Sequence, residues 1–508
     1  MPVIGIRWLM GKRLTDPIGP VDVRLGTTRG TNALLERTGA ATGLVTTAGF
    51  ADLLRIGDQT RPRLFDLHIR QAQTLYSAVV ELDERIDARG QVLRPLTEAD
   101  VRRQLSALRR DGIDTLAVCL MNSYRNPVHE RAVERLAGEL GFGHVSVSSQ
   151  ISPLQRIVPR GQTTVVDAYL TPVIRSYIDR VRAELPEASL KLMTSAGGLA
   201  VASRFSAKDS ILSGPAAGVV GCARVATAAG FERAIGFDMG GTSTDVSRYD
   251  GAFERRYEMD LEDPDSGERI RIVAPMLSIE TVAAGGGSIC GFDGLKPTVG
   301  PQSAGADPGP ACYGRGGPLC LTDANLHLGR LPTDALPLPL DAQAVTDRLD
   351  RRIAEIESAT HRRYSRDELA AGYVAIANAH MAAAIKKVSV QRGYDPGAYV
   401  LVSFGGAGGQ HACALADELG IGCILLHPYA GVLSAYGIGY ADLTVFAARD
   451  VGRLLEADAL SAVAVAFDEM AADLRGQLRA DGVADEQMIA QRSLDLRYLS
   501  QESWITIT

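Results

Sequence analysis

The sequence predicts an α/β protein, and two observations lead to that prediction. Short apolar runs typical of strands alternate with amphipathic segments typical of helices, a pattern that implies a parallel or mixed sheet with helices packed on it. Between two strand-like runs, at residues 238–245, lies the glycine-rich segment Asp-Met-Gly-Gly-Thr-Ser-Thr-Asp. The chain has 508 residues, enough for about three domains at ~150 residues each.

The central segment has the residues of a phosphate cradle. The apolar run 234–237 is typical of a buried strand and ends at Asp238. Gly240 and Gly241 allow backbone angles closed to other residues and leave their amides bare. Bare amides and hydroxyls suit a phosphate, and the carboxylates of Asp238 and Asp245 suit Mg²⁺ or a reacting water. The alternative is an ordinary glycine-rich hairpin turn. The hydroxyls come from Thr242, Ser243 and Thr244.

A second glycine-rich turn follows the strand predicted at 399–404. Glycines at a strand–helix junction let a flat ring or a ribose approach the backbone. His411, which ends this turn, is more in keeping with a packed or hydrogen-bonded histidine than with a catalytic base, because nothing nearby supplies a nucleophile. The candidate nucleoside contacts are Gly405, Gly406, Gly408 and Gly409.

Before the central hairpin, residues 5–11 suggest the end of a helix, and a Gly-Thr-Thr turn follows the strand at 21–25. This turn is a candidate anion site at a helix N-terminus, or else a helix cap. Residues 49–67 mix charged and apolar positions, which by itself is typical of a salt-bridged surface loop. Further strands are expected at 41–47, 114–120, 144–148 and 190–194, and helices from 97 and at 126–141, 161–185 and 213–230.

Single residues decide where several of these elements begin and end. Thr97 with Asp100 resembles a capping box, and Pro172 should end or kink the helix at 161–185. Ser365 and Glu368 form a second capping box, which opens a helix that runs to 393.

The last part of the chain begins with a long segment rich in Gly and Pro at 294–339, of a kind that is functional or disordered. A strand is expected at 421–426 and a helix at 456–480. Alternating residues at 494–498 and 505–507 indicate strands, and the last strand is expected to lack a partner, leaving an open edge.

Composition narrows the class of protein. Hydrophobic residues make up 46% and charged residues 22% of the chain, as in globular proteins. The net charge of −7 argues against nucleic acid or an anionic membrane as partner. No run reaches the ~20 apolar residues of a membrane span, and the N-terminus lacks a signal-peptide layout. Seven scattered cysteines without a C-x-x-C pair predict a cytoplasmic protein. The spacing of Cys312 and Cys320 matches no zinc pattern.

The extended hairpin motif resembles the nucleotide-binding fold of sugar kinases, Hsp70 and actin, and lacks the Lys of a P-loop. The resemblance implies an actin-like ATPase fold with two lobes, phosphates on the 240–244 turn and adenosine on the 405–409 turn. That fold uses a first hairpin of the same type, and none precedes residue 21.

Several stretches together resemble the hydantoinase A and 5-oxoprolinase family, and within it the ATP-dependent 5-oxoprolinases. The resemblance runs from about residue 21 to the C-terminus. It divides the chain into an N-terminal-type domain at 1–207, truncated at its start, an ATP-binding domain at 208–454, and a C-terminal helix with the start of a further domain at 455–508. The stretches lie at 24–37, 49–59, 212–218, 236–245, 284–288, 322–326 and 404–411.

The family resemblance implies ATP-driven opening of a cyclic amide, with 5-oxo-L-proline converted to L-glutamate. A lactam is a poor electrophile until its carbonyl oxygen is phosphorylated, and water then opens the ring. The implied cofactors are ATP with Mg²⁺ or Mn²⁺, the metal at Asp238, and K⁺ is a further candidate. Catalysis falls to Asp238 and Asp245. On the substrate side the candidates are Thr27, Thr28, Asn32, Arg55 and Gln59.

Partners and alternatives follow from the same resemblance. Members of the family work with a hydantoinase B-like subunit or domain, and an oligomer is expected. An N-methylhydantoinase or the ATP subunit of a ketone carboxylase is the alternative enzyme. A truncated nucleotide-binding fragment without catalysis is the non-enzymatic alternative, favoured by the lack of a first hairpin.

Overall fold

The glycine-rich hairpin lies at the centre of a five-stranded mixed sheet. The computed structural model describes residues 2–58, 73–262, 269–331, 333, 339–501 and 504–507. The strand order is β14-β11-β10-β17-β18. β10 pairs in parallel with β17, which pairs in parallel with β18, whereas the β10–β11 and β11–β14 pairs are antiparallel. The strands are β10 (Arg233–Met239), β11 (Thr244–Asp250), β14 (Ile279–Val282), β17 (Val400–Phe404) and β18 (Ile424–Leu426).

Helices cover both faces of this sheet. Ile235, Phe237 and Met239 pack into one core cluster with the buried side of α11, and Ala234 packs into another with residues of α8. Because side chains on both faces of β10 are buried, residues 234–237 form a continuous apolar run instead of an alternating one. The capping box of Ser365 and Glu368 opens α11 as predicted. The helices are α8 (Ser213–Ala228), α11 (Arg366–Val388), α12 (Ala412–Leu419) and α13 (Leu433–Tyr440).

A three-stranded sheet of order β1-β8-β9 forms the base of the N-terminal part. The 28-residue helix α7 lies against it and continues through Pro172. Of the two outcomes expected at Pro172, an end of the helix or a kink in it, the end is therefore wrong, because the buried residues on both sides, such as Leu170 and Ile174, hold the helix in the core. The elements are α1 (Pro2–Leu9), β1 (Asp22–Leu25), α2 (Arg29–Leu35), α7 (Ile157–Glu184), β8 (Ser189–Met193) and β9 (Leu199–Val201).

A second α/β unit is inserted between α2 and α7, with its own apolar core. Its main sheet has four parallel strands in the order β3-β2-β6-β7, and β4 and β5 form a separate antiparallel pair. Thr97 is the N-cap residue of α4 but makes no side-chain capping bond, so the capping box predicted there is wrong. The elements are β2 (Thr42–Thr47), α3 (Leu53–Ile56), β3 (Ala78–Leu82), β4 (Arg85–Ile86), β5 (Val92–Arg94), α4 (Glu98–Arg110), β6 (Thr115–Cys119), α5 (Val128–Glu139), β7 (His144–Val147) and α6 (Ser148–Ile151).

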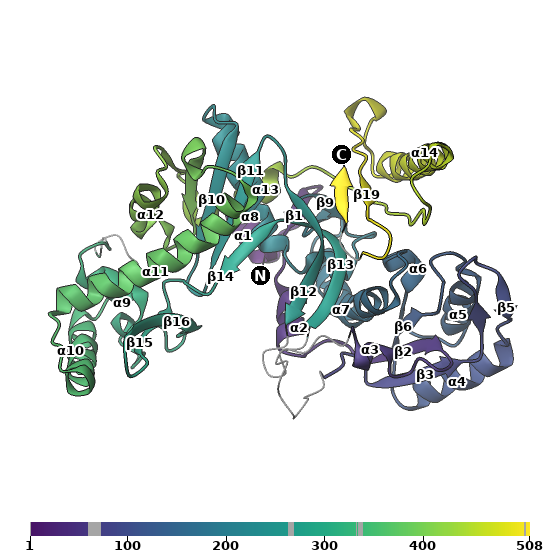
Figure 1. Ribbon diagram of the computed structural model, residues 1–508, viewed down its shortest axis with the longest axis horizontal. Coiled ribbons are helices and arrows are strands. Elements are labelled where there is room, and N and C mark those ends of the chain that lie inside the picture. The colour runs from purple at the N-terminus through teal and green to yellow at the C-terminus, as the bar shows by residue number, and fades with distance from the viewer. Residues whose placement is uncertain are drawn as a thin grey trace.

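A long antiparallel ribbon connects the five-stranded sheet to the core around α7 and the three-stranded sheet. It consists of β12 (Arg255–Glu262) and β13 (Arg269–Leu277), which lie between β11 and β14 in the sequence. Ile272, Ala274 and Met276 of this ribbon join the core formed by α7 and β8. Figure 1 shows the ribbon crossing beside α7, at the middle of the molecule.

The segment rich in Gly and Pro is partly regular in structure. It holds β16, which pairs antiparallel with β15 just before the segment, and the short helix α9, and α10 follows it. The bounds are β15 (Ser288–Phe292), β16 (Pro297–Ser303), α9 (Leu321–His327) and α10 (Ala342–Thr360).

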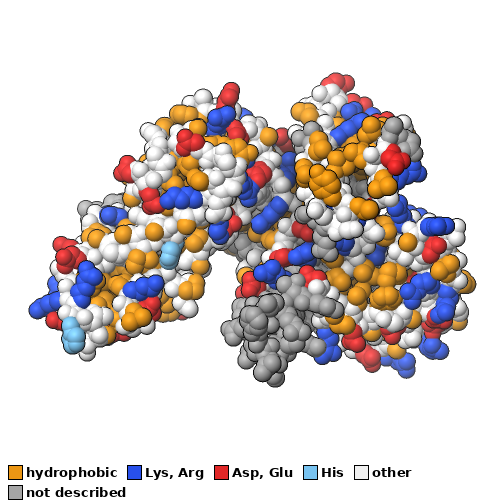
Figure 2. All heavy atoms as spheres, in the orientation of Figure 1, with side chains coloured by type: hydrophobic (Ala, Val, Ile, Leu, Met, Phe, Trp, Pro, Cys, Tyr) orange, Lys and Arg blue, Asp and Glu red, His pale blue; other side chains and the backbone are white. Residues whose placement is uncertain are grey.

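The C-terminal part has α14 (Ala457–Ala480) and the strands β19 (Leu494–Leu496) and β20 (Ile505–Ile507). β20 pairs antiparallel with β19, so the expectation of a last strand without a partner is wrong. In the described part of the chain, no helix is both long and apolar enough to cross a bilayer. Figure 2 shows positive and negative side chains interspersed over the face in view, without a basic stripe there.

Candidate active site

The central hairpin is built as the sequence predicts, with a four-residue turn between β10 and β11. The Gly240 N–H donates to the Ser243 carbonyl oxygen at 3.0 Å and closes the turn. Gly241 and Thr242 are exposed at its tip, and an added Cβ at Gly241 would meet nothing within 4 Å. Thr244 is different, because it is buried and its hydroxyl donates to the Ala284 carbonyl oxygen at 2.5 Å. Its hydroxyl is therefore directed into the protein rather than toward the turn.

Asp238 and Asp245 are cross-strand neighbours at the mouth of this turn. Burial, and secondly the charge of Asp245, raise the pKa of Asp238 to about 6. Burial also raises the pKa of Asp245, opposed by a hydrogen bond that the Thr281 hydroxyl donates to its Oδ1 at 2.6 Å. Two half-buried carboxylates side by side favour a bound cation, which would stabilise both charges.

The second glycine-rich turn lies against the first. The parallel strands β10 and β17 end at the same edge of the sheet, and the Ala407 N–H donates to the Met239 carbonyl oxygen at 3.0 Å. Gly405 has a φ of +80°, and an added Cβ there would lie 2.5 Å from Asp238 Oδ1. Only glycine fits at this contact. Gly406 and Gly409 are exposed and Gly408 is buried.

A third glycine-rich segment, residues 285–287, supports the turn of the hairpin. The Gly286 N–H donates to Gly240 O at 3.0 Å and the Gly287 N–H donates to Gly241 O at 2.6 Å. The N–H and the hydroxyl of Thr322, on α9, both donate to Gly286 O, at 2.8 and 2.7 Å. The sequence motifs at 284–288 and 322–326 marked these residues as part of the family pattern, but their contact with the hairpin is visible only in the structure.

His411 is fully buried and bonded on both ring nitrogens. Its Nδ1 lies 2.7 Å from Asn378 Oδ1, and its Nε2 lies 3.0 Å from Asn325 Nδ2. With these amide orientations Nδ1 carries the proton and Nε2 accepts. Burial lowers the pKa of His411 to about 4, with a smaller contribution from Arg330. The prediction of a packed, hydrogen-bonded histidine is confirmed.

Comparison with known proteins identifies the family. Residues 160–446 match the family model described as hydantoinase/oxoprolinase, and residues 3–141 match that of the hydantoinase/oxoprolinase N-terminal region. The chain belongs to the hydantoinase/oxoprolinase family. The resemblance found in the sequence is thereby confirmed.

The relatives of this hydantoinase/oxoprolinase chain include named enzymes. 5-Oxoprolinase 1 of Arabidopsis thaliana is 41% identical in an alignment of 554 positions that covers all of this chain and 43% of that protein. The caprolactamase subunit alpha of Pseudomonas jessenii is 35% identical, over 97% of this chain and 72% of the subunit. The crystal structure of the ATP-dependent caprolactamase from the same organism superimposes with a TM-score of 0.81 at 33% identity, covering all of this chain and 75% of that one. The chain spans less than half the length of the plant 5-oxoprolinase.

The substrate-side candidates lie on the N-terminal part of the oxoprolinase-family chain, outside the two glycine-rich turns. Thr27 is buried, and its carbonyl oxygen accepts from the hydroxyl of Ser213, the first residue of α8, at 2.9 Å. Thr28 and Asn32 are exposed at the start of α2, and Arg55 is exposed on α3, in the inserted unit. Gln59 lies outside the described residues. The fold thus gathers Thr27, Thr28 and Asn32 at one strand end and leaves Arg55 on another unit.

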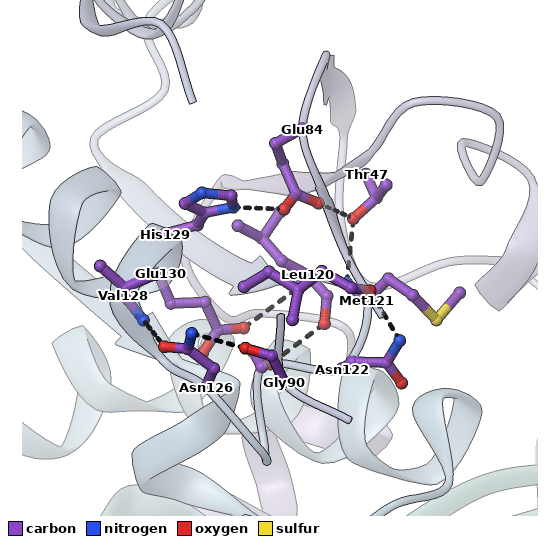
Figure 3. Close-up of polar contacts among 12 residues, drawn as sticks. Thr47, Glu84, Gly90, Leu120, Met121, Asn122, Asn126, Val128, His129 and Glu130 are labelled. Carbon is purple, nitrogen blue, oxygen red and sulfur yellow. Dashed lines mark hydrogen bonds and ion pairs between the residues drawn. The ribbon is translucent and has the colours of Figure 1, made fainter. Parts of the chain in front are cut away.

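Sequence reasoning did not single out a buried polar cluster at the ends of the inserted strands (Figure 3). The Thr47 hydroxyl donates to Glu84 and accepts the Met121 N–H at 2.9 Å, and Glu84 Oε2 lies 2.6 Å from His129 Nδ1. Glu130 accepts the Leu120 N–H at 2.9 Å. These groups bond to one another and are buried, so the cluster joins the loops at this sheet edge to each other. Its members are spread over 84 residues of sequence, which no local motif could reveal.

Proposed function

We propose that this chain is the ATP-handling part of a hydrolase that opens a cyclic amide, with 5-oxo-L-proline as substrate and L-glutamate as product. The observation that carries the proposal is the meeting of two glycine-rich turns beside the pair Asp238 and Asp245, at one edge of a sheet. The 41% identity with a 5-oxoprolinase over the whole chain supports the substrate.

An actin-like ATPase fold is the finer assignment that we favour. It is supported by the strand order β14-β11-β10-β17-β18, with two antiparallel pairs followed by two parallel ones. In that fold the hairpin contacts phosphates and the turn after the fourth strand contacts adenosine. We also keep the division at 1–207, 208–454 and 455–508. It is supported by the apolar cluster around α11, whose residues all follow residue 208. The cluster around α7 comes mostly from residues before 208 and is joined by Ile211 and by Ile272, Ala274 and Met276.

The residues at the hairpin fit ATP with a divalent cation. The exposed tip at Gly241 and Thr242, with Ser243 beside it, offers amides and hydroxyls to phosphate oxygens. Across the described residues, no group of three or more His, Cys, Asp or Glu is placed to hold a metal ion. Mg²⁺ is usually held by one or two carboxylates together with phosphates and water, which matches Asp238 and Asp245. Mn²⁺ has the same ligand preference, and K⁺ stays a further candidate.

Bound ATP would supply the phosphoryl group that turns the amide oxygen into a leaving group. The chain's part is to place and neutralise charge. Asp238 contacts the Gly405 turn and is suited to the cation, whereas Asp245, held by Thr281, is suited to orient the attacking oxygen. His411 is neutral and enclosed between two amides, so it supports the turn rather than moving a proton.

A larger lactam is the second candidate substrate. It is favoured by the superposition on the caprolactamase, in which this chain covers 75% of the solved chain. A hydantoinase B-like partner is supported by the name of the relative called caprolactamase subunit alpha and by the 43% coverage of the plant protein. An N-methylhydantoinase, a ketone carboxylase subunit and a fragment without catalysis remain alternatives. Seven free cysteines favour the cytoplasm.

The test is an ATPase assay on the purified chain with 5-oxoproline, caprolactam or no lactam, each with and without a hydantoinase B-like partner. We expect little lactam-dependent hydrolysis by the chain alone, and a rise by orders of magnitude with the partner, because phosphoryl transfer needs charge enclosed on several sides. Vigorous turnover by the chain alone would contradict the need for a partner. No binding of ATP under any condition would contradict the ATP-handling role.

A further inference from the structure

We propose that Thr281 is a positioning residue, which holds the carboxylate of Asp245 in the orientation needed at the hairpin. The inference rests on the proposed function, because it assigns a role within the same site. Thr281 lies on β14, at the edge of the central sheet, and belongs to none of the glycine-rich turns.

The register of the three antiparallel strands places Thr281 beside Asp245. Thr281 is the cross-strand partner of Asp245, and Asp245 is the cross-strand partner of Asp238. Directly opposed residues project from the same face of a sheet, so the three side chains form one row. Glu280, the residue before Thr281 on β14, belongs to the other face, where its Oε1 accepts a hydrogen bond from Lys387 Nζ of α11 at 2.5 Å. The hydroxyl of Thr281 is thus directed along the row.

The hydrogen bond from Thr281 selects one orientation of the carboxylate. The hydroxyl donates to Asp245 Oδ1 at 2.6 Å, a length typical of a bond from a hydroxyl to an ionised oxygen. The last torsion of an aspartate is broad, so the backbone alone does not orient the two oxygens. The bond to Thr281 turns Oδ1 toward β14, the strand on the far side of β11 from Asp238. Thr281 therefore fixes the rotation of this carboxylate and, with it, the position of its second oxygen.

The same strand also places the support of the turn. β14 ends at Val282, opposite Thr244, and the chain then runs directly into the segment 285–287, which donates to Gly240 and Gly241. A slip of one residue in β14 would move Thr281 to the other face and shift this segment. The bond between Thr281 and Asp245 is therefore part of the register that assembles the site.

The first experiment compares Thr281→Val with Thr281→Ser in ATP hydrolysis, with the partner supplied. Valine keeps the shape and removes the donor, so we expect kcat to fall about tenfold while KM for ATP stays within about twofold, because orientation rather than binding is lost. Serine keeps the hydroxyl and should recover most of the rate. Thr227→Val, at an exposed position in the last turn of α8, is the matched control for the substitution. A Thr281→Val enzyme with the rate of wild type, or a serine variant as slow as valine, would overturn the proposal.

The second experiment needs no nucleotide. Unfolding midpoints of the free protein are measured for Thr281→Val, Asp245→Asn and the double variant. If the side chains act together, the double variant shifts by less than the sum of the single shifts, whereas additive shifts would show that the bond is not formed. In the activity assay, Thr281→Val should have no further effect once Asp245 is Asn. If wild type does not bind ATP, the proposed function is refuted but the role of Thr281 is not. The unfolding midpoints of the single and double variants would still decide whether Thr281 holds Asp245.

Discussion

Asp238 and Asp245 are paired residues in the antiparallel register of β10 and β11, so their side chains lie side by side on one face of the hairpin. Like charges opposed on a sheet destabilise it, and both groups are partly withdrawn from water. A protein keeps such a pair where a cation or a reacting group will be bound. The pair is the feature from which the predictions about this hairpin start.

Asp238→Asn should reduce ATP turnover by at least about tenfold while leaving the melting temperature equal or higher. The substitution removes a charge that burial and Asp245 disfavour, but it also removes a ligand suited to the cation. The measurements are calorimetry and ATPase rate on the same preparation. A collapse of the melting temperature together with a normal rate for the folded fraction would show that Asp238 is structural.

The stability of the free protein should depend on pH through Asp238. Burial, and secondly the charge of Asp245, raise its pKa in the folded protein to about 6 from an ordinary value of 3.8. The folded state therefore binds more protons than the unfolded state between these values, and stability falls as pH rises from about 4 to 6. Over this range we expect the free energy of unfolding of wild type to fall by about 1–2 kcal/mol relative to that of Asp238→Asn, after allowance for solvent screening. Denaturant titrations at several pH values, without nucleotide, measure the difference, and parallel curves would contradict it.

Gly241→Val should abolish Mg-ATP binding without harming the fold. An added side chain at Gly241 meets no protein atom within 4 Å, so it would project from the tip of the turn into the proposed phosphate position. Isothermal titration should show at least a tenfold loss of affinity, or about 1.4 kcal/mol. Gly372→Val, at an equally open position on α11, is the control. Unchanged affinity in Gly241→Val would show that the phosphates of ATP do not bind at this turn.

Gly405→Ala and Gly406→Ala should differ in stability although they are neighbours. At Gly405, φ is +80° and a Cβ would lie 2.4 Å from the Met239 carbonyl oxygen, whereas at Gly406 the space is open. We expect Gly405→Ala to reduce the free energy of unfolding by about 1–3 kcal/mol and Gly406→Ala to change it little. Chemical denaturation measures both. Equal stabilities would show that the contact between the two turns is loose.

His411 should make the protein sensitive to acid. Burial lowers its pKa in the folded protein to about 4 from an ordinary value of 6.5. The unfolded state therefore binds more protons between these values, and stability falls as pH drops from 7 to 5. The free energy of unfolding at pH 5 should be lower than at pH 7 by about 2 kcal/mol. His411→Gln should flatten this part of the curve, and the exposed His380→Gln should not. An unchanged slope in His411→Gln would assign the sensitivity to other groups, among them His144, whose pKa burial also lowers to about 4.

Predictions from local sequence were correct where residues a few positions apart determine the structure of the segment. The apolar run before Asp238 specifies burial, and the capping box at Ser365 specifies a helix start, each through near neighbours in sequence. Gly240 and Gly241 form the turn without a positive φ, so the special backbone angles expected of them are not used there. Predictions failed where distant contacts outweigh local preference. Pro172 stays within α7 because the flanking side chains are buried, and β20 finds β19 as a partner.

By itself, the sequence determined the two glycine-rich turns, the candidate carboxylates and the family. Only the tertiary structure decided that the two turns touch, that the segment 285–287 supports the hairpin, and that Thr281 bonds to Asp245. The physical reason is the range of the interactions. Turn chemistry and burial are encoded in residues a few positions apart, whereas the parallel pairing of β10 with β17 joins residues more than 160 positions apart. That pairing is set by the packing of the whole sheet between its helices.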